Sequence, residues 1–148
     1  MTDTILPVAG GLLNKEIIDH AYLSVGLSDS MFGRTAEEYA AGLSHLRAMM
    51  AEYPFDQLGF DDAGAAVGEE GGIARRWLSA VAYSLGERIG SSIGKPLNPQ
   101  FVRIKVRAMS ELDAWAYANA APTVKLARND PYGSGHRGFV RTFTTGAE

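Results

Sequence analysis

Side chains that commonly carry out chemistry are few and scattered in this sequence. The three histidines, His20, His45 and His136, lie in separate segments, and none has a partner one helical turn away. A zinc site would need such ligands to converge. Cysteine is absent, which excludes thiolate ligands, disulfides and a cysteine nucleophile. We also identify no nucleophile elbow among the serines. The sequence therefore predicts no metal, no cofactor and no catalytic residue.

Acidic pairs are the best case for an enzyme, since two carboxylates can cleave a glycosidic bond. Such a reaction needs one carboxyl group whose pKa is raised by burial, and nothing in the sequence encloses these acids. We interpret them as solvating charge and as partners for positive helix N-termini. The pairs are Glu37/Glu38, Asp61/Asp62 and Glu69/Glu70.

Two glycine-rich stretches resemble nucleotide-binding motifs but depart from them. In "GSSIGKP", residues 90–96, three residues separate the glycines, whereas a phosphate-binding loop has four. Pro96 also stands where that loop carries a magnesium-binding hydroxyl. The glycines of "GSGHRG", residues 133–138, neither follow a predicted strand nor open a predicted helix. We expect nucleotide binding at neither stretch.

The hydrophobic pattern predicts an all-α protein. Expected helices begin at Asn14 as a cap, at a capping box of Thr35 and Glu38, near Ile73, and at Asn98-Pro99. The second should end at Pro54 and the fourth near Ala121, and no strand is expected. Expected apolar stripes are Tyr39, Leu43, Leu46, Met50 and Tyr53 on the second helix, and Phe101, Ile104, Ala108, Leu112 and Trp115 on the fourth.

The third helix, expected over residues 73–89, is apolar almost all round and should lie in the middle of the bundle. Residues 55–72 form an irregular acidic loop. The organisation we expect is a leader over residues 1–13, a four-helix core domain over 14–121, and an extended C-terminal tail over 122–148. The leader lacks the basic start and the length of a signal peptide or membrane span.

Charge is unevenly distributed along the chain. Residues 1–70 contain 12 acids and 3 bases, whereas residues 71–148 contain 5 acids and 11 bases. The basic half can bind nucleic acid, or it can meet the acidic half of another copy. Two solvated surfaces without a partner are the third possibility.

Three segments occur in an order that is similar to a known family. They are "LRAMMAEY" (residues 46–53), "AVAYSLGERIG" (80–90) and "AYANAAP" (116–122), with the acidic stretch after the first. The sequence resembles the head-to-tail adaptors of short-tailed phages, also called tail accessory factors or packaged-DNA stabilisation proteins. The resemblance covers about residues 14–137. Gly90-Ser91 departs from it, because the family often has Ala-Pro there.

The resemblance implies a structural virion protein that binds the portal protein as a ring of twelve copies. Such a ring extends the channel for packaged double-stranded DNA, helps to retain that DNA, and docks the tail hub or nozzle protein. No membrane is involved. The C-terminal segment of family members reaches into the portal, which implies a portal-binding site here at Asn129, Asp130, Pro131, Tyr132, Phe139, Val140 and Phe143. We expect the isolated chain to self-associate little.

Four arginines are candidates for the contact between subunits or for the channel wall: Arg75, Arg76, Arg103 and Arg107. Two other functions remain open from the sequence. One is a helical module that binds DNA non-specifically through its basic half, and the other is a virion-associated enzyme that cleaves peptidoglycan.

Overall fold

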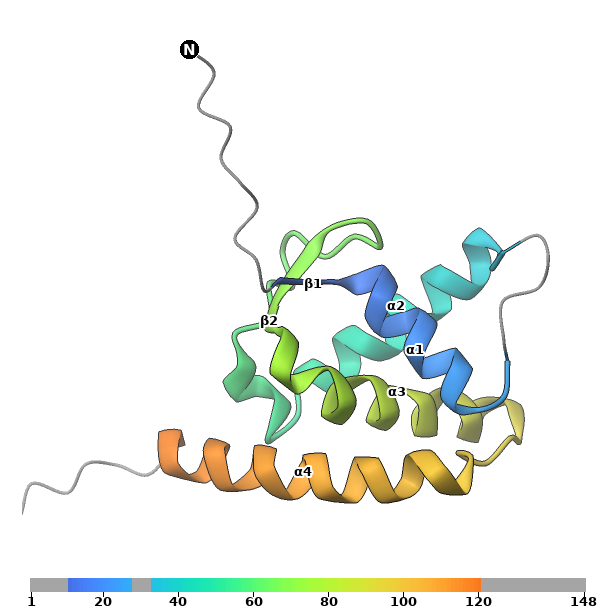
Figure 1. Ribbon diagram of the computed structural model, residues 1–148. Coiled ribbons are helices and arrows are strands. Elements are labelled where there is room, and N and C mark those ends of the chain that lie inside the picture. Colours follow the sequence, from blue (N-terminus) through green and yellow to red (C-terminus); the bar gives the residue numbers. More distant parts are fainter. Residues whose placement is uncertain (1–10, 28–32, 121–148) are drawn as a thin grey trace, which may run out of the picture.

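The computed structural model describes residues 11–27 and 33–120 and is predominantly α-helical (Figure 1). This part of the chain contains four α-helices, two short 3-10 helices and one small two-stranded sheet. The elements are β1 (Gly11–Leu13), α1 (Asn14–Ser24), α2 (Ala36–Met50), η1 (Phe55–Leu58), β2 (Glu70–Ala74), η2 (Arg75–Trp77), α3 (Leu78–Ile93) and α4 (Pro99–Ala120).

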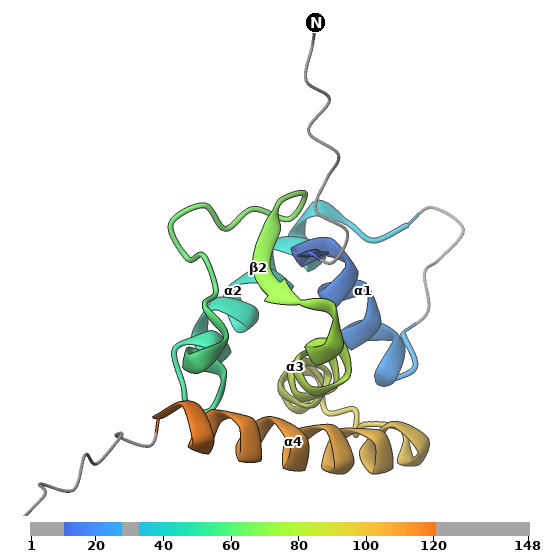
Figure 2. The same cartoon turned by 60° about the vertical axis from the view of Figure 1, so that its left-hand side comes forward.

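Helix α3 lies in the middle of the molecule, as its all-round apolar pattern predicts. It packs against α1, α2 and α4, and Figure 2 shows it between α1 and α4. Its buried residues include small ones, Ala80, Ser84 and Gly86, together with Val81 and Leu85. Small side chains let neighbouring helices approach closely, and the large ones fill the space between them. The core is therefore organised around α3.

Helix α2 begins at the predicted capping box. The backbone N–H of Glu38 donates to the Thr35 hydroxyl at 3.2 Å, and the Thr35 N–H donates to the Glu38 carboxylate at 2.9 Å. The helix ends at Met50, however, so Tyr53 lies beyond it and is 56% exposed. Its predicted place in the buried stripe is wrong. Met49, which the stripe omits, is fully buried.

Replacing Thr35 with alanine should destabilise the protein by about 1 kcal/mol, because the backbone N–H of Glu38 loses its acceptor, the Thr35 hydroxyl. Chemical denaturation of the two proteins would measure this difference. Glu37→Ala is the control, since the Glu37 side chain is exposed and outside the capping box. Equal effects of the two substitutions would contradict the role given to Thr35.

Asn14 does not cap α1 through its side chain, contrary to the prediction. The N-cap is Leu13, and Asn14 is the first helical residue, fully buried. Its side-chain Nδ2 donates to the carbonyl of Ala66 at 2.8 Å, and its backbone N–H donates to the carbonyl of Glu69 at 3.0 Å. Asn14 thus holds the acidic loop over the start of α1.

The prediction that the chain has no strand is also wrong. β1 pairs antiparallel with β2, and Leu12 and Ile73 on these strands are fully buried. Glycine-rich strands of three and five residues give no period-2 signal of their own, so the core contacts of Leu12 and Ile73 decide their conformation. Ile73 therefore belongs to β2, and α3 begins later than expected, at Leu78.

Helix α3 also ends later than expected, at Ile93. Gly94 has φ +72°, a left-handed conformation that ends many helices. Helix α3 continues through Gly90. A Cβ atom at this position would clash with the backbone carbonyl of Lys95. The close approach of the following turn explains why this position is glycine.

Helix α4 has nearly the expected bounds, and its stripe is partly correct. Leu112 is fully buried, and Phe101 packs on Tyr83 of α3 with ring centroids 5.0 Å apart. Ile104 is 44% exposed, so its predicted burial is wrong. The helix instead turns Met109 towards α3, where its sulfur accepts from the Ser84 hydroxyl at 3.4 Å. None of the helices in the described residues is long and apolar enough to span a membrane.

Candidate functional site

Arg75, one of the four candidate arginines, lies in η2 and is half exposed. Its Nη2 is 3.2 Å from the Glu16 carboxylate of α1. The sequence predicts a helix that begins near Ile73, so Arg75 would lie in its first turn, where the helix dipole disfavours a cation. In the structure it precedes α3 and has a carboxylate partner. This ion pair joins η2 to the start of α1.

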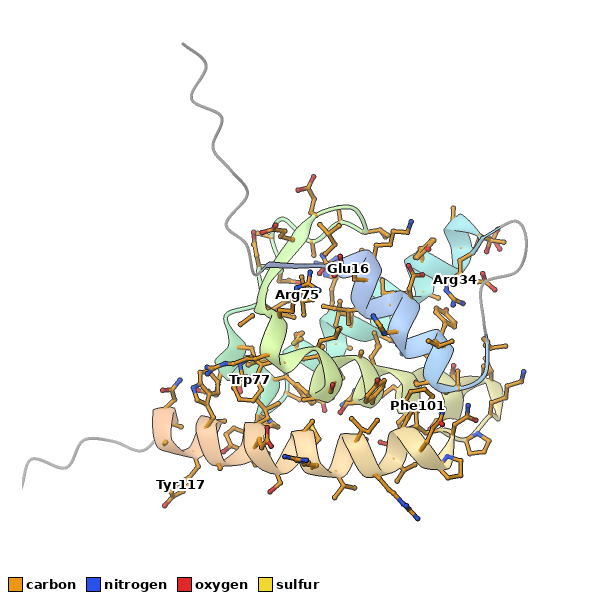
Figure 3. The ribbon with its side chains drawn as sticks, viewed as in Figure 1. Glu16, Arg34, Arg75, Trp77, Phe101 and Tyr117 are labelled. Carbon is orange, nitrogen blue, oxygen red and sulfur yellow. The ribbon has the colours of Figure 1, made fainter. Side chains whose placement is uncertain are left out.

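Arg76 lies over two tryptophan rings. Its guanidinium carbon is 4.6 Å from the centroid of the Trp77 ring and 5.6 Å from that of Trp115. The two indoles are themselves in contact, with centroids 5.2 Å apart. Cation–π contacts of this kind contribute about 0.5–1 kcal/mol at exposed sites. Arg76 therefore helps to attach the C-terminal part of α4 to η2. Figure 3 shows Trp77 close to this end of α4.

Arg103 and Arg107 lie on the exposed side of α4. The Arg107 side chain is 86% exposed, and its Nε is 3.5 Å from the Glu111 carboxylate one turn further along. Such exposed pairs contribute little to stability. Arg107 and Trp115 are eight residues apart, about 12 Å along the helix axis. Arg103 and Arg107 are therefore separated along α4 from the Arg76–Trp115 contact.

Part of the charge asymmetry is balanced within the chain. Glu16 pairs with Arg75, and Glu52 pairs with Arg88, so two acids of the N-terminal half meet two bases of the C-terminal half. Lys105 on α4 pairs with Glu87 on α3. The two pairs between the halves offset part of the positive charge that the described part of the C-terminal half presents to nucleic acid.

The predicted portal-binding residues Asn129, Asp130, Pro131, Tyr132, Phe139, Val140 and Phe143 lie outside the described residues. The described chain ends at Ala120, the last residue of α4. The tail prediction thus depends on the sequence and the resemblance alone.

The acidic pairs do not show the environment of a general acid. Glu38 belongs to the capping box, and Asp61 accepts from the Gly64 N–H at 3.1 Å. Asp62 accepts from Arg47 Nε at 2.6 Å, and this hydrogen bond lowers the pKa of the Asp62 carboxyl group. A general acid in glycoside cleavage needs a raised pKa. Arg47 and Asp62 line an open hollow of about 450 Å³ beside η1.

One further stretch has the spacing of a catalytic serine motif but not its structure. Residues 90–94, "GSSIG", fit Gly-x-Ser-x-Gly, a match that the sequence analysis missed. Ser92 lies in the last turn of α3, and its hydroxyl donates to the Ile89 carbonyl at 2.7 Å, so it is not on a strand-to-helix elbow. Within residues 11–27 and 33–120, no three His, Cys, Asp or Glu side chains lie close enough to hold a metal ion.

The outward side of α4 is a surface that the sequence analysis missed. Two large apolar side chains on it are exposed, Val106 at 64% and Tyr117 at 73%, and Val102 at its edge is 41% exposed. Tyr117 points away from the other helices (Figure 3). Grouped exposed apolar residues commonly mark an interaction surface. The signal was available in the sequence, because the helical period places Val106 and Tyr117 on the side of the helix away from Leu112.

A comparison of the sequence with protein-family models gives no match, and a comparison with curated proteins gives none either. The family resemblance therefore depends on the three quoted segments and on their order along the chain.

Proposed function

We propose that this chain is a structural virion protein, a head-to-tail adaptor of a short-tailed phage. It assembles as a ring beneath the portal protein, extends the DNA channel, helps to retain packaged DNA, and provides the docking surface for the tail. Its fold in this proposal is a four-helix core with an irregular acidic loop and an extended C-terminal tail. In this proposal the protein is located in the virion.

One observation carries the proposal: the three family-like segments occur in the family's order. "LRAMMAEY" covers the end of α2 and the turn after it, "AVAYSLGERIG" lies on α3, and "AYANAAP" begins in the last turns of α4. α3 contacts both α2 and α4, so these segments belong to elements of one core. The acidic pairs and Ser92 do not form a catalytic site in the described residues.

Ring assembly gives a role to two of the four arginines. A closed ring of identical subunits uses two different surfaces of each copy. Arg103 and Arg107 are exposed and supply positive charge for an acidic neighbour or for DNA in the channel. Arg75 and Arg76 have partners within the chain, which makes them supports of the fold as much as contacts of the assembly.

Mixing the full chain with its cognate purified portal ring tests the proposal. Electron microscopy should show a second ring of density attached to the portal, and the complex should co-sediment. The copy number can then be counted from the symmetry of the images. Portal rings that stay undecorated at saturating adaptor concentration would refute the proposal.

The two alternatives give different results in simple assays. A non-specific DNA-binding module would retain duplex DNA without the portal, and retention would fall steeply with salt. A peptidoglycan-cleaving enzyme would reduce the turbidity of cell-wall material, and one carboxylate substitution would abolish this. The adaptor proposal predicts neither result for the isolated chain.

A further inference from the structure

A line of exposed residues runs along the outward side of α4. Its central residues are Arg103, Val106, Ser110, Asp113 and Tyr117, at steps of 3, 4, 3 and 4. Residues at such steps lie on one side of an α-helix. All five residues are exposed, Val106 at 64% and Tyr117 at 73%. We call these residues, together with Arg107, the outer face of α4.

The charges of the outer face change sign along the helix. Arg103 and Arg107 lie in the N-terminal half of α4, whereas Asp113 lies in the C-terminal half, after Ser110. A second copy of α4 in the parallel direction would place arginine beside arginine. A copy in the antiparallel direction places each arginine half beside the other copy's acidic half. The face is therefore complementary to itself in one direction only.

We propose that two copies of this chain associate through the outer faces of their α4 helices, antiparallel and related by a two-fold axis at Ser110. This register sets Arg107 of each copy opposite Asp113 of the other. It also sets Arg103 opposite Tyr117, which allows a cation–π contact. Ser110 is small, so the two helices approach closely where they cross. An isologous contact of this kind repeats each interaction twice.

The strength of this association is modest. Val106 and Tyr117 supply the apolar area, and exposed ion pairs add little each. The Arg107–Glu111 pair within the helix competes with the contact to Asp113, but it is itself exposed and weak. We therefore expect a dissociation constant between micromolar and millimolar.

This inference goes beyond the proposed adaptor function and does not depend on it. The sequence alone predicted little self-association, and the exposed outer face changes that expectation. In an adaptor, the pair would cover α4 in free copies and would separate when the ring forms, because a ring does not use a two-fold contact between its neighbours.

Charge reversal tests the inference in the full-length chain. Sedimentation equilibrium should show a monomer–dimer equilibrium for the wild type. Arg107→Asp and Asp113→Arg each place like charges opposite one another twice in the dimer, so each should weaken self-association about tenfold. An equimolar mixture of the two variants should recover it, because every like-charge pair then becomes an opposite pair. The double variant should recover it by the same reasoning.

A matched control is Glu69→Arg, a charge reversal at the exposed residue before β2. Figure 2 shows β2 and α4 on opposite sides of α3. It should leave self-association unchanged, and circular dichroism should show that every variant stays folded. Three results would each overturn the inference: a monomeric wild type at millimolar concentration, two variants that fail to recover when mixed, or an equal loss with Glu69→Arg. Loss of portal assembly would not affect it, and loss of the dimer would not affect the portal proposal.

Discussion

Replacing Gly86 with alanine is expected to destabilise the protein by about 2 kcal/mol, although alanine is the better helix former. The gain from helix propensity is about 1 kcal/mol. Overpacking a core costs about 1–3 kcal/mol, and more where the neighbour cannot move. We expect the second effect to exceed the first, and to lower Tm by about 4–8 °C for a chain of this size.

The reason is the close approach of α1 and α3 at Gly86. A Cβ atom there would lie 2.8 Å from the backbone carbonyl oxygen of Ala21 and closer still to the hydroxyl oxygen of Ser24. That hydroxyl is buried and donates to the Ala21 carbonyl at 2.6 Å. The serine side chain can rotate only by giving up this hydrogen bond. The backbone of α1 would have to move away from α3.

Gly68→Ala is the control, because a Cβ at position 68 meets nothing within 4 Å and the backbone there is not left-handed. It should be neutral or slightly stabilising, as it restricts the unfolded chain. The double variant Ser24→Ala, Gly86→Ala should recover part of the loss, since one of the two clashing oxygens is gone. Thermal and chemical denaturation measure all of these. A Gly86→Ala protein as stable as the wild type would show that α1 and α3 are less tightly packed.

Local signals in the sequence predict the parts of the fold that depend on neighbouring residues. The capping box of Thr35 and Glu38 involves only four consecutive residues, so its pattern is sufficient to place the start of α2. Asn98-Pro99 likewise marks the start of α4. The apolar character of α3 around its whole circumference indicates its central position, because every side must be covered.

Features that depend on distant residues could not be predicted in this way. Asn14 looks like a helix cap, but its side chain binds the Ala66 carbonyl, 52 residues away. The two strands exist because Leu12 and Ile73 fill the same core, and neither strand has a pattern of its own. Ile104 fits the apolar period of α4, yet the packing of Phe101 and Met109 on α3 rotates it outward.

The candidate functional residues could also be predicted from the sequence only in part. The sequence drew attention to Arg75 and Arg76 but could not show that Glu16 and the two tryptophans contact them. The outer face of α4 was present as a spacing of exposed residues. It was overlooked because Val106 and Tyr117 become conspicuous only once the opposite side of the helix is known to be buried.

Deleting residues 129–148 is expected to abolish assembly on the portal while leaving the helices intact. All four helices of the described chain end at or before Ala120 and pack on one another, so we expect them to form without the deleted segment. The segment contains Tyr132, Phe139, Val140 and Phe143 among glycines and arginines, a composition without helical or strand period. We infer that these apolar side chains are buried in the portal rather than within the subunit. Co-sedimentation with portal rings, alongside circular dichroism, measures both parts of the prediction.

The loss of portal assembly is expected to be large because many tails bind one portal ring together. Each tail gives up conformational freedom when it binds, which makes a single contact weak. Neighbouring copies hold further tails near their sites, so the effective concentration is high and the assembly is much tighter than one tail. A full-length variant with alanine at Tyr132, Phe139 and Phe143 should lose as much as the deletion, because the anchors are gone although the length is kept. If this variant assembles normally while the deletion does not, other residues of the tail bind the portal. If the deletion itself assembles normally, the portal contact lies in the helical core.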